Sequence, residues 1–275
     1  MSTAARVALS IAGSDPSGGA GIQADLKTFA ALGTYGTAVL TALTAQSTRG
    51  VAGVQAVEAD FVRHQLDVLL DDVTVHATKV GMLASAATAR AVAGVLSSRT
   101  VGPVVLDPVM VATSGDRLLD DDAVAVLRDD LLPAADLVTP NVPEAAVLLG
   151  VPAARSVDDC VAQAEELLRR SGTAVLLKGG HLAGEDSVDV LARPAGTHLV
   201  RRARVATSAT HGTGCTLSSA IAALLARDPG ADLLVVVDAA RDYLQTALTG
   251  GAGLGIGHGS GPLDHSGLAA ARPPS

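Results

Sequence analysis

The chain has 275 residues, of which 48% are hydrophobic, and its formal net charge is −8. This length suits one large α/β domain or two small ones, and the apolar content is ample for a core. Binding the phosphate backbone of a nucleic acid needs a basic surface, so the negative charge argues against a nucleic-acid partner.

The two cysteines, Cys160 and Cys215, are far apart in the sequence and do not resemble a disulfide framework. The first residues lead into a strand-like run without the apolar block of a signal peptide. No apolar stretch reaches membrane-spanning length without an interrupting glycine or charge. We therefore expect a cytoplasmic protein that has no membrane partner.

Strand-like and helix-like patterns alternate along the chain. Residues 7–11 predict a buried strand, and a turn rich in glycine and serine leads from it to a helix that ends at Gly33. Further strands are expected at residues 36–42, 75–80, 104–106, 137–139 and 174–177. Further helices are expected at residues 60–70, 85–96, 121–131, 143–149 and 156–170, with Asp60 and Ser156 as N-cap residues.

A β-hairpin and two helices complete the pattern. The hairpin strands are expected at residues 187–191 and 197–206, and the helices at residues 215–226 and 232–248. Strands that alternate with helices predict a mainly parallel sheet with helices on both faces. Since no repeat or long linker interrupts the pattern, we expect a single domain over residues 1–275, with a frayed tail at residues 269–275.

The most informative motif is His211-Gly212-Thr213-Gly214-Cys215-Thr216, which lies between an extended stretch and an apolar run. A glycine-rich loop therefore enters a helix here. The first N–H groups of a helix have no internal partner and carry the positive end of its dipole. Glycine lets such a backbone approach a phosphate closely. Gly212, Thr213 and Gly214 are thus predicted to bind an anion.

Cys215 falls in the first turn of that predicted helix. The same field favours a thiolate, so we expect the pKa of this thiol to be lowered. An anion-binding loop beside an activated side chain indicates phosphoryl transfer. The alternative interpretation is an ordinary helix start with a buried cysteine.

Two common phosphate-binding motifs are absent from the sequence. Gly13 and Gly18 have the spacing of a Walker motif, but Gly19-Ala20 follow where Lys-Ser or Lys-Thr is needed. No Gly-x-Gly-x-x-Gly follows a strand either. The chain is therefore a poor candidate for a P-loop protein or a dinucleotide-binding dehydrogenase.

Polar residues instead follow most of the predicted strands, at the edge where open α/β sheets bind ligands. Three of them have a structural alternative: Asp15 suits an Asx-turn, Asn141 a helix cap, and Glu144 a charge in the first turn of a helix. Their common place at one sheet edge nevertheless favours a binding site. The residues are Asp15, Asp25, Gln46, Met82, Asp107, Asn141, Glu144, Lys178 and His181.

The same segments resemble the signatures of the hydroxymethylpyrimidine/phosphomethylpyrimidine kinases. The opening block Ala12-Gly13-Ser14-Asp15-Pro16-Ser17-Gly18-Gly19-Ala20-Gly21-Ile22-Gln23-Ala24-Asp25-Leu26-Lys27 and the Gly-Thr-Gly-Cys block are together highly specific. Further matches are Thr44-Ala45-Gln46, Lys79-Val80-Gly81-Met82, Asp107-Pro108-Val109-Met110, Thr139-Pro140-Asn141 with Glu144, Lys178-Gly179-Gly180-His181 and Gly257-His258-Gly259-Ser260-Gly261-Pro262. The resemblance implies an α/β protein with the ribokinase-like fold, a three-layer α/β/α sandwich with a mainly parallel central sheet.

The resemblance also implies roles for individual residues. Gln46 resembles a pyrimidine-binding glutamine, whose amide can pair with a ring nitrogen and the exocyclic amine. Cys215 stands where other ribokinase-like enzymes often hold an aspartate base, and Lys178 matches a residue that contacts the transferred phosphate. Asp107 and Glu144 match carboxylates that organise Mg²⁺.

Two larger sets complete the implied site. The residues that match positions lining the pyrimidine pocket are Gly13, Asp25, Gln46, Met82 and Val109. Those assigned to ATP and its anion hole are Asn141, Lys178, Gly212, Thr213 and Gly214. One departure, Thr113 where many relatives have lysine, puts a loop contact to phosphate in doubt.

The function implied is an ATP-dependent kinase of thiamine biosynthesis. It would phosphorylate 4-amino-5-hydroxymethyl-2-methylpyrimidine and then the monophosphate, with Mg²⁺, as a homodimer, which is the usual state in this superfamily. A pyridoxal kinase of the same fold is the alternative, since a small aromatic ring with one CH₂OH group describes both substrates. A catalytically silent pyrimidine-binding protein is a third reading, against which the intact Cys215, Lys178, Asp107 and Glu144 count.

Overall fold

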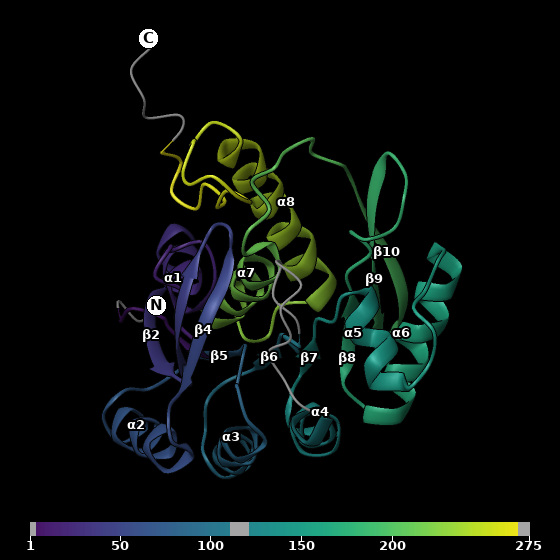
Figure 1. Ribbon diagram of the computed structural model, residues 1–275. Helices are drawn as coiled ribbons and strands as arrows, with labels where there is room; N and C mark the ends of the chain where they lie inside the picture. Colours follow the sequence, from purple (N-terminus) through teal and green to yellow (C-terminus); the bar gives the residue numbers. More distant parts are fainter. Residues whose placement is uncertain (1–3, 111–120, 269–275) are drawn as a thin grey trace.

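The structure, a computed structural model, describes residues 4–110 and 121–268. In this part of the chain an eight-stranded sheet has the order β10-β9-β8-β7-β6-β5-β1-β2, with helices on both faces (Figure 1). Six neighbouring strands are parallel: β1 (Val7–Ala12), β2 (Tyr35–Leu40), β5 (Ala77–Val80), β6 (Val104–Leu106), β7 (Leu137–Val138) and β8 (Ala174–Leu177). The hairpin of β9 (Asp186–Arg193) and β10 (Gly196–Ala203) extends one edge antiparallel. The expected three-layer α/β/α sandwich is confirmed.

The sheet divides the core in two because successive side chains of a strand point to opposite faces. In β1, Leu9 and Ile11 belong to one core cluster and Ala8 to the other. The first cluster packs against α2 (Ala59–Asp72), α3 (Ala86–Ser98), α4 (Asp121–Val126), α5 (Val142–Leu149) and α6 (Val157–Ser171). The second packs against α1 (Gly21–Ala31), α7 (Thr213–Arg227) and α8 (Leu233–Gly251).

A second, two-stranded sheet was not expected from the sequence. The strand predicted at residues 36–42 ends at Leu40, and β3 (Ala42–Ser47) and β4 (Gly50–Ala56) then form an antiparallel hairpin of their own. Thr41 makes the turn away from the main sheet, with its hydroxyl donating to the Met82 carbonyl at 2.6 Å. The hairpin carries Gln46 beside the carboxyl ends of the main strands.

Two of the helix predictions need correction. Asp60 is not an N-cap: α2 begins one residue earlier, after Glu58, and Asp60 lies in its first turn. The helix expected at residues 121–131 continues past α4 as a π-helical segment, Leu127–Leu131. Ser156 is confirmed as an N-cap, since its hydroxyl accepts from the Asp159 N–H in a capping box.

Two predictions fall on parts of the chain outside the described residues. They concern Thr113 and the tail at residues 269–275. Within residues 4–110 and 121–268, no helix combines the length and the apolar character needed to cross a membrane.

Candidate active site

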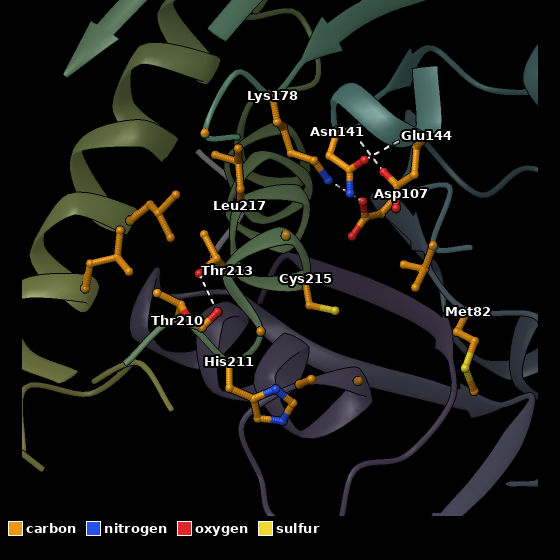
Figure 2. Close-up of a pocket in the computed structure, with 18 of the residues that line it drawn as sticks. Met82, Asp107, Asn141, Glu144, Lys178, Thr210, His211, Thr213, Cys215 and Leu217 are labelled. Carbon is orange, nitrogen blue, oxygen red and sulfur yellow. Dashed lines mark hydrogen bonds and ion pairs between the residues drawn. The ribbon is translucent and has the colours of Figure 1, made fainter. Parts of the chain in front are cut away.

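One pocket of about 700 Å³ lies along the carboxyl ends of the parallel strands (Figure 2). This is where an open α/β sheet binds its ligands, because the loops that follow the parallel strands meet there. All of the predicted site residues line it except Asp25. Those brought together are Gly13, Gln46, Met82, Asp107, Val109, Asn141, Glu144, Lys178, Gly212, Thr213, Gly214 and Cys215.

Lys178 and Asp107 form an ion pair at the centre of this pocket. Lys178 follows β8 and Asp107 follows β6, and Nζ lies 2.8 Å from Oδ1. Burial disfavours the ammonium form, but Asp107 and Glu144 together outweigh it, and the pKa of Lys178 is raised. The side chain is therefore a permanent cation at neutral pH that faces the pocket.

Asn141 and Glu144 begin α5 in a capping box beside this pair, as Figure 2 shows. The Asn141 side chain accepts from the Glu144 N–H at 2.9 Å, and Oε2 of Glu144 accepts from the Asn141 N–H at 2.7 Å. Burial raises the pKa of Glu144 to about 7, with Lys178 opposing the shift. The helix cap expected at Asn141 and the first-turn charge expected at Glu144 are thus confirmed. Both residues also line the pocket.

The glycine-rich loop before α7 takes the predicted place. Gly212 has a φ of +84° and packs so tightly on the Gly19 carbonyl that any side chain there would clash with it. A Cβ on Gly214 would lie 3.3 Å from Nζ of Lys178 and 3.4 Å from Oδ2 of Asp107. The N-terminus of α7 therefore lies close against the ion pair, because Gly214 has no side chain. A helix N-terminus attracts anions through its free N–H groups.

Asp15 joins the first loop to the α7 loop. Its Oδ1 accepts from the Ser17 N–H, the expected Asx-turn, and its Oδ2 lies 2.8 Å from Nε2 of His211. Burial opposes ionisation of Asp15, but hydrogen bonds from His211 and Ser17 outweigh it and lower its pKa to about 2. The carboxylate also accepts from the backbone of Gly19 and Ala20, so it fixes the loop on which Gly212 packs.

Gln46 enters the pocket from β3, at an irregularity in the β3–β4 register. Such a bulge redirects a side chain relative to its strand. The Thr44 hydroxyl donates to the Ser14 carbonyl at 2.8 Å and lies 3.0 Å from Oε1 of Gln46, so it ties the amide to the first loop. A Cβ on Gly13 would meet the end of the Met82 side chain, so these two predicted pocket residues are in contact.

Asp25 does not line the pocket as the resemblance implied. It is fully buried beneath it, where Oδ1 and Oδ2 accept from Nζ of Lys79 at 3.0 and 2.8 Å. The hydroxyls of Ser10 and Ser219 donate to the same carboxylate at 2.6 and 2.7 Å. Asp25 therefore has no oxygen left for a substrate, and its role in this site is internal.

The expected lowering of the Cys215 pKa is wrong. Burial raises the pKa of this thiol to about 11, and the nearby Lys79 and the Gly21 N–H only partly oppose that shift. The helix dipole acts over a single turn, whereas loss of water penalises the thiolate directly. In the protein without ligands, Cys215 is a thiol at neutral pH.

One arm of the pocket was not expected from the sequence. Beyond Lys178 the lining continues onto the end of β10 and the adjoining face of α8. No local signal singles these residues out, since Leu244 and Leu248 have the spacing of an ordinary amphipathic helix. The added residues include Ala203, Arg204, Val205, Arg241, Leu244, Gln245 and Leu248.

An ammonium group and a glycine-rich helix N-terminus at the strand ends are parts that phosphoryl transfer uses. In a three-layer α/β/α sandwich whose sequence lacks a Walker motif, they fit a kinase of the ribokinase-like class. The sequence profile of phosphomethylpyrimidine kinase matches residues 15–264. The chain is 52% identical over 259 residues to the hydroxymethylpyrimidine/phosphomethylpyrimidine kinase of Escherichia coli K12, covering 94% of this chain and 96% of that one. The chain belongs to the phosphomethylpyrimidine kinase family.

Two solved structures support the fold. Bacillus subtilis pyridoxal kinase, solved as an ADP complex, has a TM-score of 0.88 at 34% identity over 96% of this chain and 99% of its own. The phosphomethylpyrimidine kinase of Clostridium difficile has a TM-score of 0.76 at 39% identity over 87% of this chain and 97% of its own. The chain is thus a kinase with the same architecture as both groups.

Proposed function

We propose that the enzyme transfers the γ-phosphoryl group of ATP to 4-amino-5-hydroxymethyl-2-methylpyrimidine and then to the monophosphate, in thiamine biosynthesis. In the first step the hydroxyl oxygen bonds to the γ-phosphorus, the bond to the β,γ-bridging oxygen breaks, and ADP leaves. The hydroxyl proton is released. The second step attacks from a phosphate oxygen in the same way and yields the diphosphate.

The observation that carries this proposal is the convergence of three groups in one pocket: the Lys178 ammonium, the glycine-rich N-terminus of α7 and the Gln46 amide. Phosphoryl transfer depends on positioning and on stabilising charge at the moving phosphoryl group. Lys178 and the N–H groups around Gly214 supply that charge. The amide supplies donors and an acceptor for a nitrogen ring.

Magnesium is the divalent ion we propose for ATP. Among residues 4–110 and 121–268 no three His, Cys, Asp or Glu side chains gather as a metal site. Magnesium does not need such a cage, because it is usually held by one or two carboxylates together with phosphate oxygens and water. Asp107 and Glu144 both line the pocket, and among the described residues Oδ2 of Asp107 receives only a long hydrogen bond of 3.4 Å from Ser218. These two carboxylates would hold the ion, which supplies charge neutralisation for the triphosphate.

Gln46 is proposed as the group that selects the pyrimidine. Gln46→Ala leaves the polar edge of the bound ring without hydrogen-bond partners, which costs about 1–3 kcal/mol of binding free energy. The KM for the pyrimidine should therefore rise by roughly 10- to 100-fold. The KM for ATP should stay within about twofold of that of the unmodified enzyme. An unchanged pyrimidine KM with a raised ATP KM would show that Gln46 serves the nucleotide instead.

Cys215 is proposed as the catalytic acceptor of the hydroxyl proton. Because its pKa is raised by burial, only a small fraction is thiolate at neutral pH. Cys215→Ala should therefore lower the kcat of the first step toward the lower end of the 10²–10⁴-fold range typical of general bases, about 10²-fold. Cys215→Asp should recover part of it, and the second step, from an ionised oxygen, should depend less on this residue. An unchanged first step in Cys215→Ala would make Cys215 a packing residue.

The deciding experiment incubates the purified protein with ATP, magnesium and either the pyrimidine alcohol or pyridoxal. Products are separated by chromatography, so monophosphate and diphosphate are measured apart. We expect successive appearance of pyrimidine monophosphate and diphosphate, and both products about 10²–10³-fold more slowly with Lys178→Met. A higher kcat/KM for pyridoxal would favour the pyridoxal kinase alternative. Binding of the pyrimidine without turnover would identify a silent binding protein.

Assembly and location are part of the same proposal. We propose a homodimer, because dimers are usual in the superfamily, and light scattering after size exclusion measures its mass. We also propose a cytoplasmic location, with which the two unpaired cysteines, Cys160 and Cys215, agree.

A further inference from the structure

A buried cation, Lys79, lines the same pocket as the proposed catalytic thiol. Lys79 is the penultimate residue of β5, and its side chain has no exposed area. It is held by Asp25, which accepts two hydrogen bonds from its Nζ. An ammonium has three donors, so one N–H remains beyond the two that Asp25 receives. Lys79 nevertheless lines the pocket floor.

The same network reaches the helix that carries Cys215. Ser219 donates to Oδ1 of Asp25 at 2.7 Å, and Ser219 lies one helical turn after Cys215 in α7. Residues four apart share one face of a helix. The face of α7 that bears Cys215 is therefore bonded to the carboxylate that holds Lys79.

The charges around the sulfur are of both signs. Four charged groups interact with Cys215: Lys79 from β5, Asp25 from α1, Asp107 after β6 and Lys178 after β8. Lys79 is the largest influence that favours the thiolate, and the two aspartates disfavour it. A proton acceptor at this position consequently depends on the cation beneath it.

We propose that Lys79, locked by Asp25, is a positioning residue for Cys215: it holds a fixed positive charge under the first turn of α7 that stabilises negative charge on the sulfur. The proposal rests on the proposed role of Cys215. It explains why a lysine and an aspartate are both buried in the core here, which a purely structural role would not require, because apolar residues of similar size usually serve stability as well.

The test isolates the lysine charge by comparing Asp25→Asn with the double variant Asp25→Asn/Lys79→Met. Both lack the Asp25 charge, so they differ only at Lys79. The rate of Cys215 alkylation by iodoacetamide is followed by peptide mass spectrometry between about pH 6.5 and about pH 9, since thiolate is the reacting form. We expect the double variant to react about 10-fold more slowly, which corresponds to a pKa shift of about one unit.

Ser219→Ala is the matched control, because it removes one hydrogen bond to Asp25 and leaves both charges in place. Its alkylation rate should stay within about twofold of that of the unmodified protein. Thermal unfolding checks that each variant is folded, and the fully buried Cys160 reports opening of the chain in the same digest. Equal alkylation rates in the two folded variants would overturn the proposal.

Alkylation needs no substrate, so this outcome is separate from the proposed function. If the unmodified enzyme fails to phosphorylate the pyrimidine, the function is wrong whatever the alkylation rates are. If it succeeds, the double variant should also lose kcat for the first step relative to Asp25→Asn, with the KM for ATP unchanged. Loss of kcat with equal alkylation rates would make Lys79 structural.

Discussion

The molecule contains two lysine–aspartate pairs with the same separation and different surroundings. In both Lys79–Asp25 and Lys178–Asp107, the lysine Nζ lies 2.8 Å from a carboxylate oxygen. The side chains of the first pair are both 0% exposed, whereas in the second the lysine is 14% and the aspartate 2% exposed. In the first pair, two serine hydroxyls donate further hydrogen bonds to the Asp25 carboxylate. In the second, the ammonium faces the pocket and can exchange its carboxylate for a phosphate. The two pairs consist of the same residue types. What distinguishes the internal Lys79 charge from the reactive Lys178 charge is whether a ligand can reach it.

The largest expected effect is on stability, at the closed pair. Lys79→Met leaves the Asp25 charge buried and unpaired, which should lower the free energy of unfolding by about 3–5 kcal/mol. Urea unfolding measures it. The control is Lys27→Met at an exposed lysine. It removes one hydrogen bond, from Nζ to the Gly18 carbonyl, and should lower the free energy of unfolding by at most about 1 kcal/mol. A loss below about 1 kcal/mol at Lys79 would mean that the closed pair is not held as described.

The open pair should respond in activity instead. Lys178→Met removes the cation aimed at the transferred phosphoryl group, and kcat should fall by about 10²–10³-fold. The free energy of unfolding should fall by only about 1–2 kcal/mol. Asp107 keeps the hydrogen bond that the Thr139 hydroxyl donates to it, and water in the pocket can hydrate its carboxylate. If stability fell as much as in Lys79→Met, the distinction between the pairs would be lost.

A third buried carboxylate, Asp15, extends the comparison to a smaller change in the free energy of unfolding. Asp15 is paired with a histidine, and its pKa falls from 3.8 to about 2. A lowered folded pKa contributes stability that is present above the unfolded value and lost as the pH falls from about 4 toward about 2. Asp15→Asn should therefore lower the free energy of unfolding by about 2 kcal/mol near neutral pH, with the difference vanishing near pH 2. A difference that does not vary with pH would show that the charge of Asp15 contributes nothing.

The main sheet could be predicted because each buried parallel strand is a short apolar run between turn signals. The β3–β4 hairpin could not, because its two-residue turn, Thr48-Arg49, lacks the Asn-Gly or Asp-Gly signal and β4 is largely exposed. The strand-end rule and the family resemblance together located the pocket.

The errors at Asp25 and Cys215 have one physical cause. Sequence position shows which side chains come near a site, but not whether water reaches them. Asp25 comes near the pocket and is sealed beneath it. Cys215 begins a helix and is only partly exposed there, and burial raises the pKa of its thiol. One signal was available: a lysine inside a predicted buried strand, Lys79, requires a buried partner of opposite charge.

The contact between Gly212 and the Gly19 carbonyl has a consequence for when the enzyme becomes competent. It joins segments that lie nearly 200 positions apart, as do the bonds His211–Asp15 and Ser219–Asp25, which span 196 and 194 residues. Closing a loop of that length costs on the order of 5 kcal/mol of chain entropy. Contacts so distant in sequence form late in folding. During synthesis the first loop must therefore wait until α7 has left the ribosome, and the proposed anion hole is assembled only after most of the chain has been made.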